Sequence, residues 1–447
     1  MKILITSDWY KPQINGVVTS ILNLEKGLKA LGHDVRILTL SQNIRYHKSD
    51  NVTYLSSLNA DPIYPGARIV RVLVQSEIED IIEWKPDIIH SQCEFSTFQV
   101  ALKIADKTKA PIVHTYHTCY EDYTQYVHFL SHIGRGIIAA MSRQIVSQTR
   151  CVIVPTQKVK VILERYRVNR PIVVIPTGLD LDTFLTPIDT HLISDLKEKL
   201  QIPSHHKVLL YLGRIAQEKH IDEIIDNLKR MEIEELTFVI VGGGPYLTKL
   251  QSKVAHLGMK DRVIFTGMVN PQEVPLYYRL GDIFTSASTS ETQGLTYIEA
   301  LASGVPSLCK KDPCLEGVII DGINGYQFDA FEDFQSHLME LLTDDEKRCA
   351  FSQQAQKIMR ENFGYLQFAQ RAEEVYKKAL SSPMDTNRLL SRAELYFIMD
   401  KLRSRLLASL RKFHVKAERL KGGMDSLVEN DWGMSDWRKK WEDYKTK

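Results

Sequence analysis

Two glutamates, Glu291 and Glu299, stand eight positions apart, with Gly294 between them. The residues from Leu295 onward favour a helix. We therefore expect Glu291 in a loop, Gly294 and Leu295 at the helix N-terminus, and Glu299 about one turn inside. A helix N-terminus presents unpaired N–H groups and a positive dipole end, and both favour a phosphate. Carboxylates on either side of it could hold sugar hydroxyls, so the segment suits a nucleotide sugar. The alternative is an ordinary amphipathic helix with two solvated glutamates.

Two cations, Arg214 and Lys219, lie at and just after the end of the apolar stretch 207–214. We expect this stretch to form a buried parallel strand, and open parallel sheets bind ligands at the carboxyl ends of their strands. Arginine can hold phosphate oxygens with two N–H bonds, whereas lysine supplies a compact charge. The two residues could bind a diphosphate; the alternative is a pair of surface cations.

Gly16 and His117 are candidate site residues in the first half of the chain. Gly16 lies in a loop between a predicted strand at residues 2–7 and a predicted helix from about 17 to 31. Without a Cβ it would let the backbone approach the same diphosphate, although a plain tight turn also explains it. His117 ends a predicted strand and should lie at the ligand-binding edge, although such a histidine is often a structural hydrogen-bonding group.

Two parallel sheets are needed to position these residues. Short apolar stretches alternate with helical sequence twice along the chain, which indicates an α/β fold with two Rossmann-like, doubly wound domains. We place the N-terminal domain at residues 1–182 and the nucleotide-sugar domain at residues 183–363. A helix at 364–383 and a tail at 384–447 follow.

The composition is that of an ordinary globular protein, with 44% hydrophobic and 25% charged residues and a net charge of +2. Six cysteines without paired spacing indicate reduced thiols rather than disulfides or a zinc site. The N-terminus lacks a signal-peptide pattern, and no apolar run reaches the roughly 18 residues that span a bilayer. We therefore expect a cytoplasmic protein without a membrane-spanning segment.

The tail carries a one-signed charge and aromatic side chains. Between Lys401 and Lys421 there are eight Lys or Arg residues and one acid, and apolar residues fall on one helical stripe. Each cation near an anionic membrane contributes about 1 kcal/mol, and tryptophans favour the interface. We expect contact with anionic lipids rather than nucleic acid; a solvated helix or a dimer contact is the alternative. The candidate membrane residues are Lys401, Arg403, Arg405, Arg411, Lys412, Lys416, Arg419, Trp432, Trp437 and Trp441.

Three other patterns are interpreted as structural. Asp180 and Asp182 form an Asp-x-Asp pattern, but we expect them to cap a helix rather than to bind a metal. His128 and His132 have the spacing of helical metal ligands, but they lack an evident third ligand. The glycine run 242–244 should form a turn before a helix, and contact with the diphosphate is the alternative. We predict no metal site and no required metal or other cofactor.

The spacing of Glu291 and Glu299 resembles the glutamate–seven–glutamate motif of retaining glycosyltransferases of family 4. This resemblance implies the GT-B fold, in which two Rossmann-like domains face each other across a cleft, with the acceptor on the N-terminal side. It also implies a last helix that crosses back to the first domain. By the same resemblance, Arg214 and Lys219 would hold the donor diphosphate with help from Gly16. Val269 would lie against the base, and Glu299 would hold the ribose.

The resemblance also implies the sugar-binding residues and the reaction. Glu291 would bind hydroxyls of the transferred sugar, helped by backbone N–H groups near Gly294 and Leu295, and His117 would lie beside that sugar. The product would keep the anomeric configuration of the donor. The leaving diphosphate would take the proton of the acceptor in a same-face attack.

The whole chain resembles the diacylglycerol glucosyltransferases of Gram-positive bacteria. These transfer glucose from UDP-glucose to the 3-hydroxyl of 1,2-diacylglycerol, for glycolipid and lipoteichoic acid anchor synthesis. The resemblance implies a peripheral protein on the inner face of the cell membrane. Another family 4 transferase with a polysaccharide or phosphatidylinositol acceptor is an alternative, as is a non-enzymatic nucleotide-sugar binder. The sequence does not decide whether the donor sugar is glucose or galactose. It also does not indicate the acceptor-contacting residues or the oligomeric state.

Overall fold

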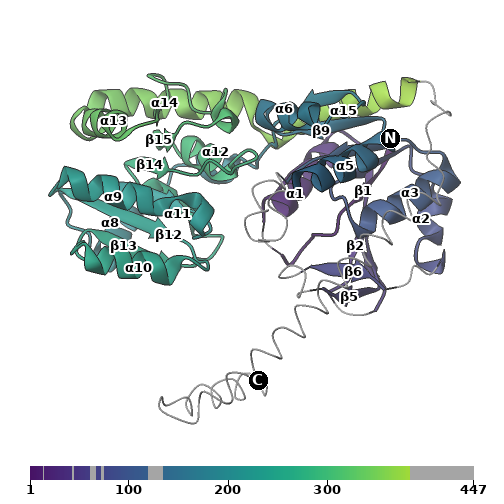
Figure 1. The fold of residues 1–447 in the computed structure, drawn as a ribbon, viewed down its shortest axis with the longest axis horizontal. Coiled ribbons are helices and arrows are strands. Elements are labelled where there is room, and N and C mark those ends of the chain that lie inside the picture. The colour runs from purple at the N-terminus through teal and green to yellow at the C-terminus, as the bar shows by residue number, and fades with distance from the viewer. Residues whose placement is uncertain (14, 43–44, 61–66, 72–74, 119–133, 383–447) are drawn as a thin grey trace, which may run out of the picture. The chain divides into compact units, whose positions relative to one another are not determined.

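The computed structural model describes the chain except for residues 14, 43–44, 61–66, 72–74, 119–133 and 383–447. The chain divides into a unit of residues 1–383 and a unit of residues 384–447, and the second unit lies outside the described residues. Within the first unit, two large sheets of mainly parallel strands carry helices on both faces (Figure 1). The predicted α/β class with two doubly wound sheets is therefore confirmed.

An eight-stranded sheet forms the centre of what we call the N-lobe, residues 2–174. Its strand order is β10-β9-β8-β7-β1-β2-β4-β3, and β3 runs antiparallel to β4 while the other pairs are parallel. The strands are β1 (Lys2–Thr6), β2 (Asp34–Leu40), β3 (His47–Ser49), β4 (Val52–Leu55), β7 (Ile88–Ser91), β8 (Ile112–Thr115), β9 (Cys151–Val154) and β10 (Ile172–Val174). A separate hairpin contains β5 (Ser57–Asn59) and β6 (Arg68–Val70).

The helices of the N-lobe cover both faces of this sheet, because consecutive residues of its central strands are buried and so both faces need cover. In β1, Ile3 and Ile5 share a core with residues of α1 and α15, whereas Leu4 shares another core with residues of α2 and α3. The helices are α1 (Gly16–Ala30), α2 (Glu79–Trp84), α3 (Ser96–Thr108), α5 (Gly134–Ser147), α6 (Gln157–Arg165) and a 3₁₀ turn, η1 (Gln75–Glu77).

A six-stranded, all-parallel sheet forms the centre of the C-lobe, residues 182–362, in the order β13-β12-β11-β14-β15-β16. The strands are β11 (Lys207–Leu212), β12 (Leu236–Val241), β13 (Val263–Gly267), β14 (Ile283–Ser286), β15 (Ser307–Lys310) and β16 (Gly325–Phe328). In β11, Val208 and Leu210 face one core while Leu209 and Tyr211 face the other.

The helices of the C-lobe pack on the two faces of this sheet and complete the two cores. They are α7 (Asp182–Leu185), α8 (Thr190–Lys199), α9 (Ile221–Met231), α10 (Leu247–His256), α11 (Val274–Leu280), α12 (Leu295–Ala302), α13 (Phe331–Thr343) and α14 (Asp345–Asn362). Two 3₁₀ turns, η3 (Gln217–Lys219) and η4 (Pro313–Leu315), follow β11 and β15.

The last described helix, α15 (Tyr365–Ser381), follows the C-lobe but packs on the N-lobe. Its Ala369, Ala372 and Tyr376 share a core with α1 and β1. The helices approach closely at Gly27, where an added Cβ would lie 2.6 Å from the Cβ of Ala369. Two segments connect the lobes, one between β10 and α7 and one between α14 and α15. Backbone hydrogen bonds pair these connecting segments, with Leu179 donating to Phe363. The chain thus passes between the lobes twice along neighbouring paths.

Candidate functional site

The loop between β14 and α12, residues 287–294, carries Glu291, and we call it the donor loop. Gly294 is the N-cap of α12 with φ of 72°, and a Cβ there would overlap the ring of Tyr297. Only glycine adopts this backbone without strain. The helix therefore begins at Leu295, and Glu299 lies one turn inside it. The predicted loop and helix positions of Glu291, Gly294, Leu295 and Glu299 are confirmed.

Lys219 and Glu291 form an ion pair, although they come from different parts of the C-lobe. Nζ of Lys219 donates to Oε1 of Glu291 over 2.5 Å, and the hydroxyl of Ser288 donates to the same oxygen over 3.1 Å. The side chains of Lys219 and Glu291 are 15% and 22% exposed. The ends of β11 and β14 are neighbours in the sheet, so the strand-end rule brings this cation and this carboxylate to one place.

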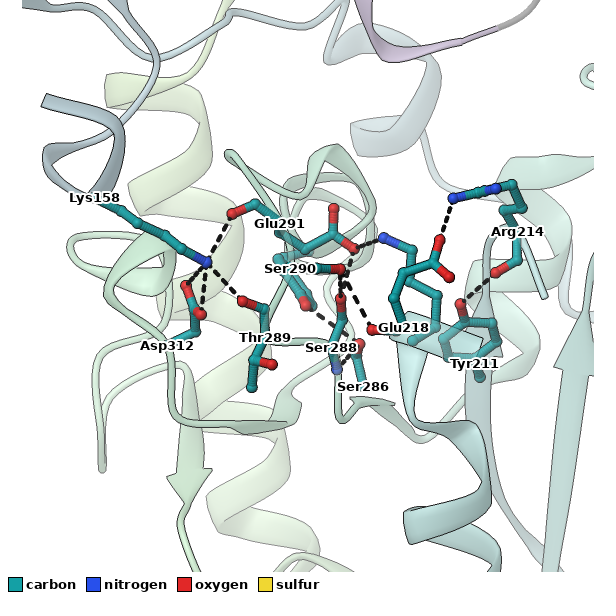
Figure 2. Close-up of polar contacts among 12 residues, drawn as sticks. Lys158, Tyr211, Arg214, Glu218, Ser286, Ser288, Thr289, Ser290, Glu291 and Asp312 are labelled. Atoms are coloured by element: carbon teal, nitrogen blue, oxygen red, sulfur yellow. Dashed lines mark hydrogen bonds and ion pairs between the residues drawn. The ribbon is translucent and has the colours of Figure 1, made fainter. Parts of the chain in front are cut away.

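Arg214 lies on the same loop as Lys219, and its guanidinium donates to the carboxylate of Glu218 (Figure 2). The arginine side chain is 47% exposed, whereas that of Glu218 is 8% exposed. The hydroxyl of Tyr211 donates to the carbonyl of Arg214 over 3.0 Å, and burial raises the pKa of that tyrosine. Arg214 therefore has a fixed backbone and a half-exposed cationic group that a ligand could reach.

The glycine run 242–244 supports the loop that carries Arg214. A Cβ on Gly242 would overlap the carbonyl of Gly213, and a Cβ on Gly244 would overlap that of Ile215. In return, Ile215 donates its N–H to the carbonyl of Gly243 over 2.9 Å. The run forms a turn that leads to α10, as predicted.

Glu299 and Val269 are the residues predicted to hold the ribose and the base. The hydroxyl of Tyr278 donates to Oε2 of Glu299 over 2.7 Å. Burial raises the pKa of Glu299 to about 7, and the tyrosine hydrogen bond opposes that shift. Val269 follows β13 and packs against the same core as Tyr278. A hydroxyl donated to Glu299 would favour the ionised carboxylate.

Gly16 brings the N-lobe close to α12. It is the first residue of α1, and the side chain of Asn15 caps that helix by accepting from the N–H of Val18 over 3.0 Å. A Cβ on Gly16 would lie 3.9 Å from Cδ1 of Leu295. The N-termini of α1 and α12 are therefore neighbours, so that two positive helix ends are available to one anionic group.

His117 follows β8 and is fixed by Gln92, whose Oε1 lies 2.6 Å from its Nε2. An amide oxygen only accepts hydrogen bonds, so Nε2 carries the proton and Nδ1 is an acceptor. Burial lowers the pKa of His117 to about 4, so the ring is neutral near pH 7. Among the described residues, its hydrogen bond goes to Gln92 and not to Glu291 or Lys219.

Several residues that support the donor loop were not predicted. The side chain of Gln293, 4% exposed, accepts from the N–H of Thr177 over 2.9 Å and donates to its carbonyl over 3.1 Å. The hydroxyl of Thr156 donates to the carbonyl of Thr292 over 2.8 Å. Lys158 on α6 donates to the same loop. Gln293 stands beside the motif, but nothing in the sequence indicates its long-range partner. Lys158 looks in the sequence like any lysine on the surface of a helix.

The predicted capping role of the Asp-x-Asp pattern is wrong. The N-cap of α7 is Leu181, without a capping side chain, and Asp182 is the first helical residue. Asp180 instead pairs with Lys26 of α1 over 2.5 Å, because the packing of α15 and α1 brings this lysine to the connecting segment. No group of three or more His, Cys, Asp or Glu suited to a metal occurs among the described residues.

Some predictions lie outside the described residues. They concern His128 and His132 and the membrane residues Lys401, Arg403, Arg405, Arg411, Lys412, Lys416, Arg419, Trp432, Trp437 and Trp441. In the part of the chain that the structure describes, no helix is both long and apolar enough to cross a membrane.

Solved structures share this architecture. Alr3699/HepE from Anabaena, in complex with UDP and glucose, superposes with a TM-score of 0.66 at 17% identity, over 85% of this chain and all of that one. WaaG, a glycosyltransferase involved in lipopolysaccharide biosynthesis, gives a TM-score of 0.62 at 17% identity, over 85% and 100% of the two chains. The fold is that of the GT-B glycosyltransferases.

Sequence comparisons define the family more narrowly. Residues 14–183 match Glycosyltransferase Family 4, and residues 193–358 match Glycosyl transferases group 1. The alpha-monoglucosyldiacylglycerol synthase of Streptococcus pneumoniae is 36% identical over 86% of this chain and 87% of that protein. The synthase of the same name from Acholeplasma laidlawii is 32% identical, over 76% and 88%. This chain belongs to the retaining glycosyltransferases of family 4.

Proposed function

We propose that this chain transfers glucose from UDP-glucose to the 3-hydroxyl of 1,2-diacylglycerol, forming the alpha-monoglucosyl lipid with retention. The observation that carries this proposal is the similarity to two alpha-monoglucosyldiacylglycerol synthases over three quarters or more of the chain. The lipid product would serve glycolipid and lipoteichoic acid anchor synthesis. The basic tail would hold the protein on the inner face of the membrane, where the acceptor lies.

The donor would bind at the N-terminus of α12. The diphosphate would lie against Arg214 and Lys219, with the N-termini of α1 and α12 supplying backbone N–H groups. The ribose would donate to Glu299, beside Val269. This orientation is supported by the half-exposed guanidinium of Arg214 and by the neighbouring helix ends at Gly16 and α12.

The sugar would lie between the donor loop and His117. Glu291 would accept from sugar hydroxyls, while its contact with Lys219 holds the carboxylate in place. The neutral ring of His117 would accept a hydroxyl proton at Nδ1, because Gln92 holds the proton on Nε2. Both groups recognise hydroxyls and neither is a nucleophile in this arrangement.

Transfer would proceed by same-face attack. The bond between the anomeric carbon and the β-phosphate oxygen breaks, the bond to the acceptor oxygen forms, and the acceptor proton moves to the departing phosphate. Charge that grows on this phosphate is stabilised by Arg214, Lys219 and the helix N-termini. Removing one such preorganised contact typically costs about 3–4 kcal/mol.

The test is incubation of the purified full chain with labelled UDP-glucose and vesicles that contain diacylglycerol and anionic lipid. We expect a labelled monoglucosyl lipid with an alpha linkage, formed roughly 100- to 1,000-fold more slowly by a Glu291→Ala variant. Parallel incubations with UDP-galactose identify the donor. Incubations with soluble sugars or phosphatidylinositol in place of diacylglycerol identify the acceptor. Transfer to one of those acceptors without labelled glycolipid would overturn the lipid assignment. Donor binding without any transfer would favour the non-enzymatic alternative.

A further inference from the structure

Lys158 extends from α6 of the N-lobe to the donor loop of the C-lobe (Figure 2). Its Nζ donates to the carbonyl of Thr289 over 2.7 Å and to the carbonyl of Glu291 over 3.1 Å. The same Nζ lies 3.0 and 2.8 Å from the two carboxylate oxygens of Asp312. One ammonium group therefore joins the main chain of the donor loop to a second loop, the one after β15.

We propose that Lys158 is a positioning residue for the transfer reaction. It holds the backbone of Glu291 so that the carboxylate reaches Lys219 and the donor sugar. This inference rests on the proposed function, because it assigns Glu291 to the sugar hydroxyls. The contacts of Lys158 with this loop go to the main-chain carbonyls of Thr289 and Glu291, so it acts on Glu291 through the loop backbone.

Burial makes this contact more than a surface ion pair. The side chains of Lys158 and Asp312 are 15% and 5% exposed, so the pair lies largely out of water. Asp312 also accepts the N–H of Cys314 over 2.8 Å and caps η4, and this second contact fixes its carboxylate. A preorganised carboxylate holds the ammonium in one position, and the remaining N–H donors then point at the loop carbonyls.

The geometry requires a lysine. Three acceptor groups surround one nitrogen, and an ammonium group has three donors to match them. A guanidinium group is planar and spreads its donors over a fork, so arginine can keep the pair with Asp312 but cannot reproduce both carbonyl contacts. A Lys158→Arg variant should therefore fold like the native chain and still transfer sugar more slowly.

The main variant is Lys158→Met, which keeps the apolar stem and removes the charge. A displacement of about 1 Å at a reacting group can cost roughly 100-fold in rate, and we expect a loss of this order in kcat/KM for UDP-glucose. The affinity for UDP, which has no sugar, should stay within about threefold, because the diphosphate and ribose contacts lie elsewhere. Lys160→Met on the same helix is the matched control, since Lys160 forms no ion pair among the described residues.

A second pair of variants separates positioning from charge balance. In Lys158→Met, Asp312 is left buried without its counter-ion, so part of any loss could come from instability. Lys158→Met with Asp312→Asn removes both charges. If Lys158 positions the loop, the double variant regains thermal stability but stays slow. Recovery of native kcat/KM in the double variant would overturn the proposal.

Hydrogen exchange of the donor loop provides a readout that does not depend on the acceptor. We expect faster exchange over residues 287–294 in Lys158→Met than in Lys160→Met, with the sheet strands unchanged. Unchanged loop exchange, or native kcat/KM in Lys158→Met, would refute the positioning role. If the wild-type chain makes no glucolipid, the proposed function fails. Loop exchange and the comparison of UDP with UDP-glucose binding then still decide the role of Lys158.

Discussion

Replacing Glu291 by alanine removes the carboxylate that the donor loop presents beside Lys219. In the structure this carboxylate accepts from Nζ of Lys219 over 2.5 Å and from Ser288 over 3.1 Å. The proposed function adds sugar hydroxyls as further donors. Hydrogen bonds to a charged group contribute about 1.5–3 kcal/mol each, and a preorganised contact in the transition state about 3 kcal/mol. We expect kcat to fall roughly 100- to 1,000-fold.

The effect on folding should be much smaller. Lys219 and Glu291 are 15% and 22% exposed, so their pair lies between a solvent-screened surface pair and a fully buried one. Losing it should cost about 1–2 kcal/mol of the free energy of unfolding. The variant therefore stays folded at assay temperature, and the loss of rate is a loss of catalysis.

Initial rates with labelled UDP-glucose and diacylglycerol vesicles give kcat and KM, and calorimetry gives the affinity for UDP. Glu291→Gln keeps one acceptor oxygen and should fall between alanine and the native residue. Glu234→Ala, at an exposed position of the same lobe, is the control for loss of a surface glutamate. A Glu291→Ala enzyme that keeps more than about a tenth of native kcat would refute the assignment. UDP affinity reduced as much as kcat would instead indicate that the residue holds the nucleotide.

Three further outcomes follow from the same site. Arg214→Ala should lower kcat roughly 100-fold or more, because a cation at the departing phosphate is lost, and near-normal turnover would exclude it from the mechanism. UDP binding should weaken as pH falls below about 7, because Glu299 with its raised pKa is then protonated and must release that proton to accept the ribose hydroxyl. Calorimetry at several pH values measures this dependence, and Glu299→Gln should flatten it. An unchanged profile in the variant would contradict the role of Glu299. Deleting residues 384–447 should reduce flotation with anionic vesicles at low salt and leave thermal unfolding unchanged, and undiminished flotation would place the membrane contact elsewhere.

Local chemistry explains which parts of the fold could be predicted from the sequence. Short apolar stretches such as 236–241 are buried at every position in the structure, and such stretches predict parallel strands beneath helices. The start of α12 was predictable because Gly294 has a positive φ that only glycine adopts easily. The strand-end rule then brought Lys219 and Glu291 together, although 72 residues separate them.

Long-range side-chain partners were not predictable in the same way. Asp180 looked like a helix cap, and its actual partner Lys26 comes from a helix more than 150 residues earlier. Likewise, the partner of Glu299 is Tyr278, whose hydroxyl reaches it because α11 packs on α12 in the C-lobe core. Pairings of this kind depend on how helices pack across a sheet, and nothing in the spacing of either residue encodes them.

The donor loop shows why a sequence motif indicates the ligand-facing groups more readily than the contacts that hold the loop in place. Its carboxylate is held by a cation of its own lobe, Lys219, whereas two of its carbonyls and that of Thr292 accept from outside that lobe, from Lys158 and Thr156. The backbone of Thr177 holds the loop through the side chain of Gln293. The chemistry at the sugar needs a carboxylate at one position, so residue type and spacing are restricted there. A carbonyl can be held by any donor that packing brings within reach, so many sequences can support the same loop. The motif therefore predicts which groups face the ligand, and only the packed structure shows that Lys158 and Thr156 of the other lobe contact the main chain of the donor loop.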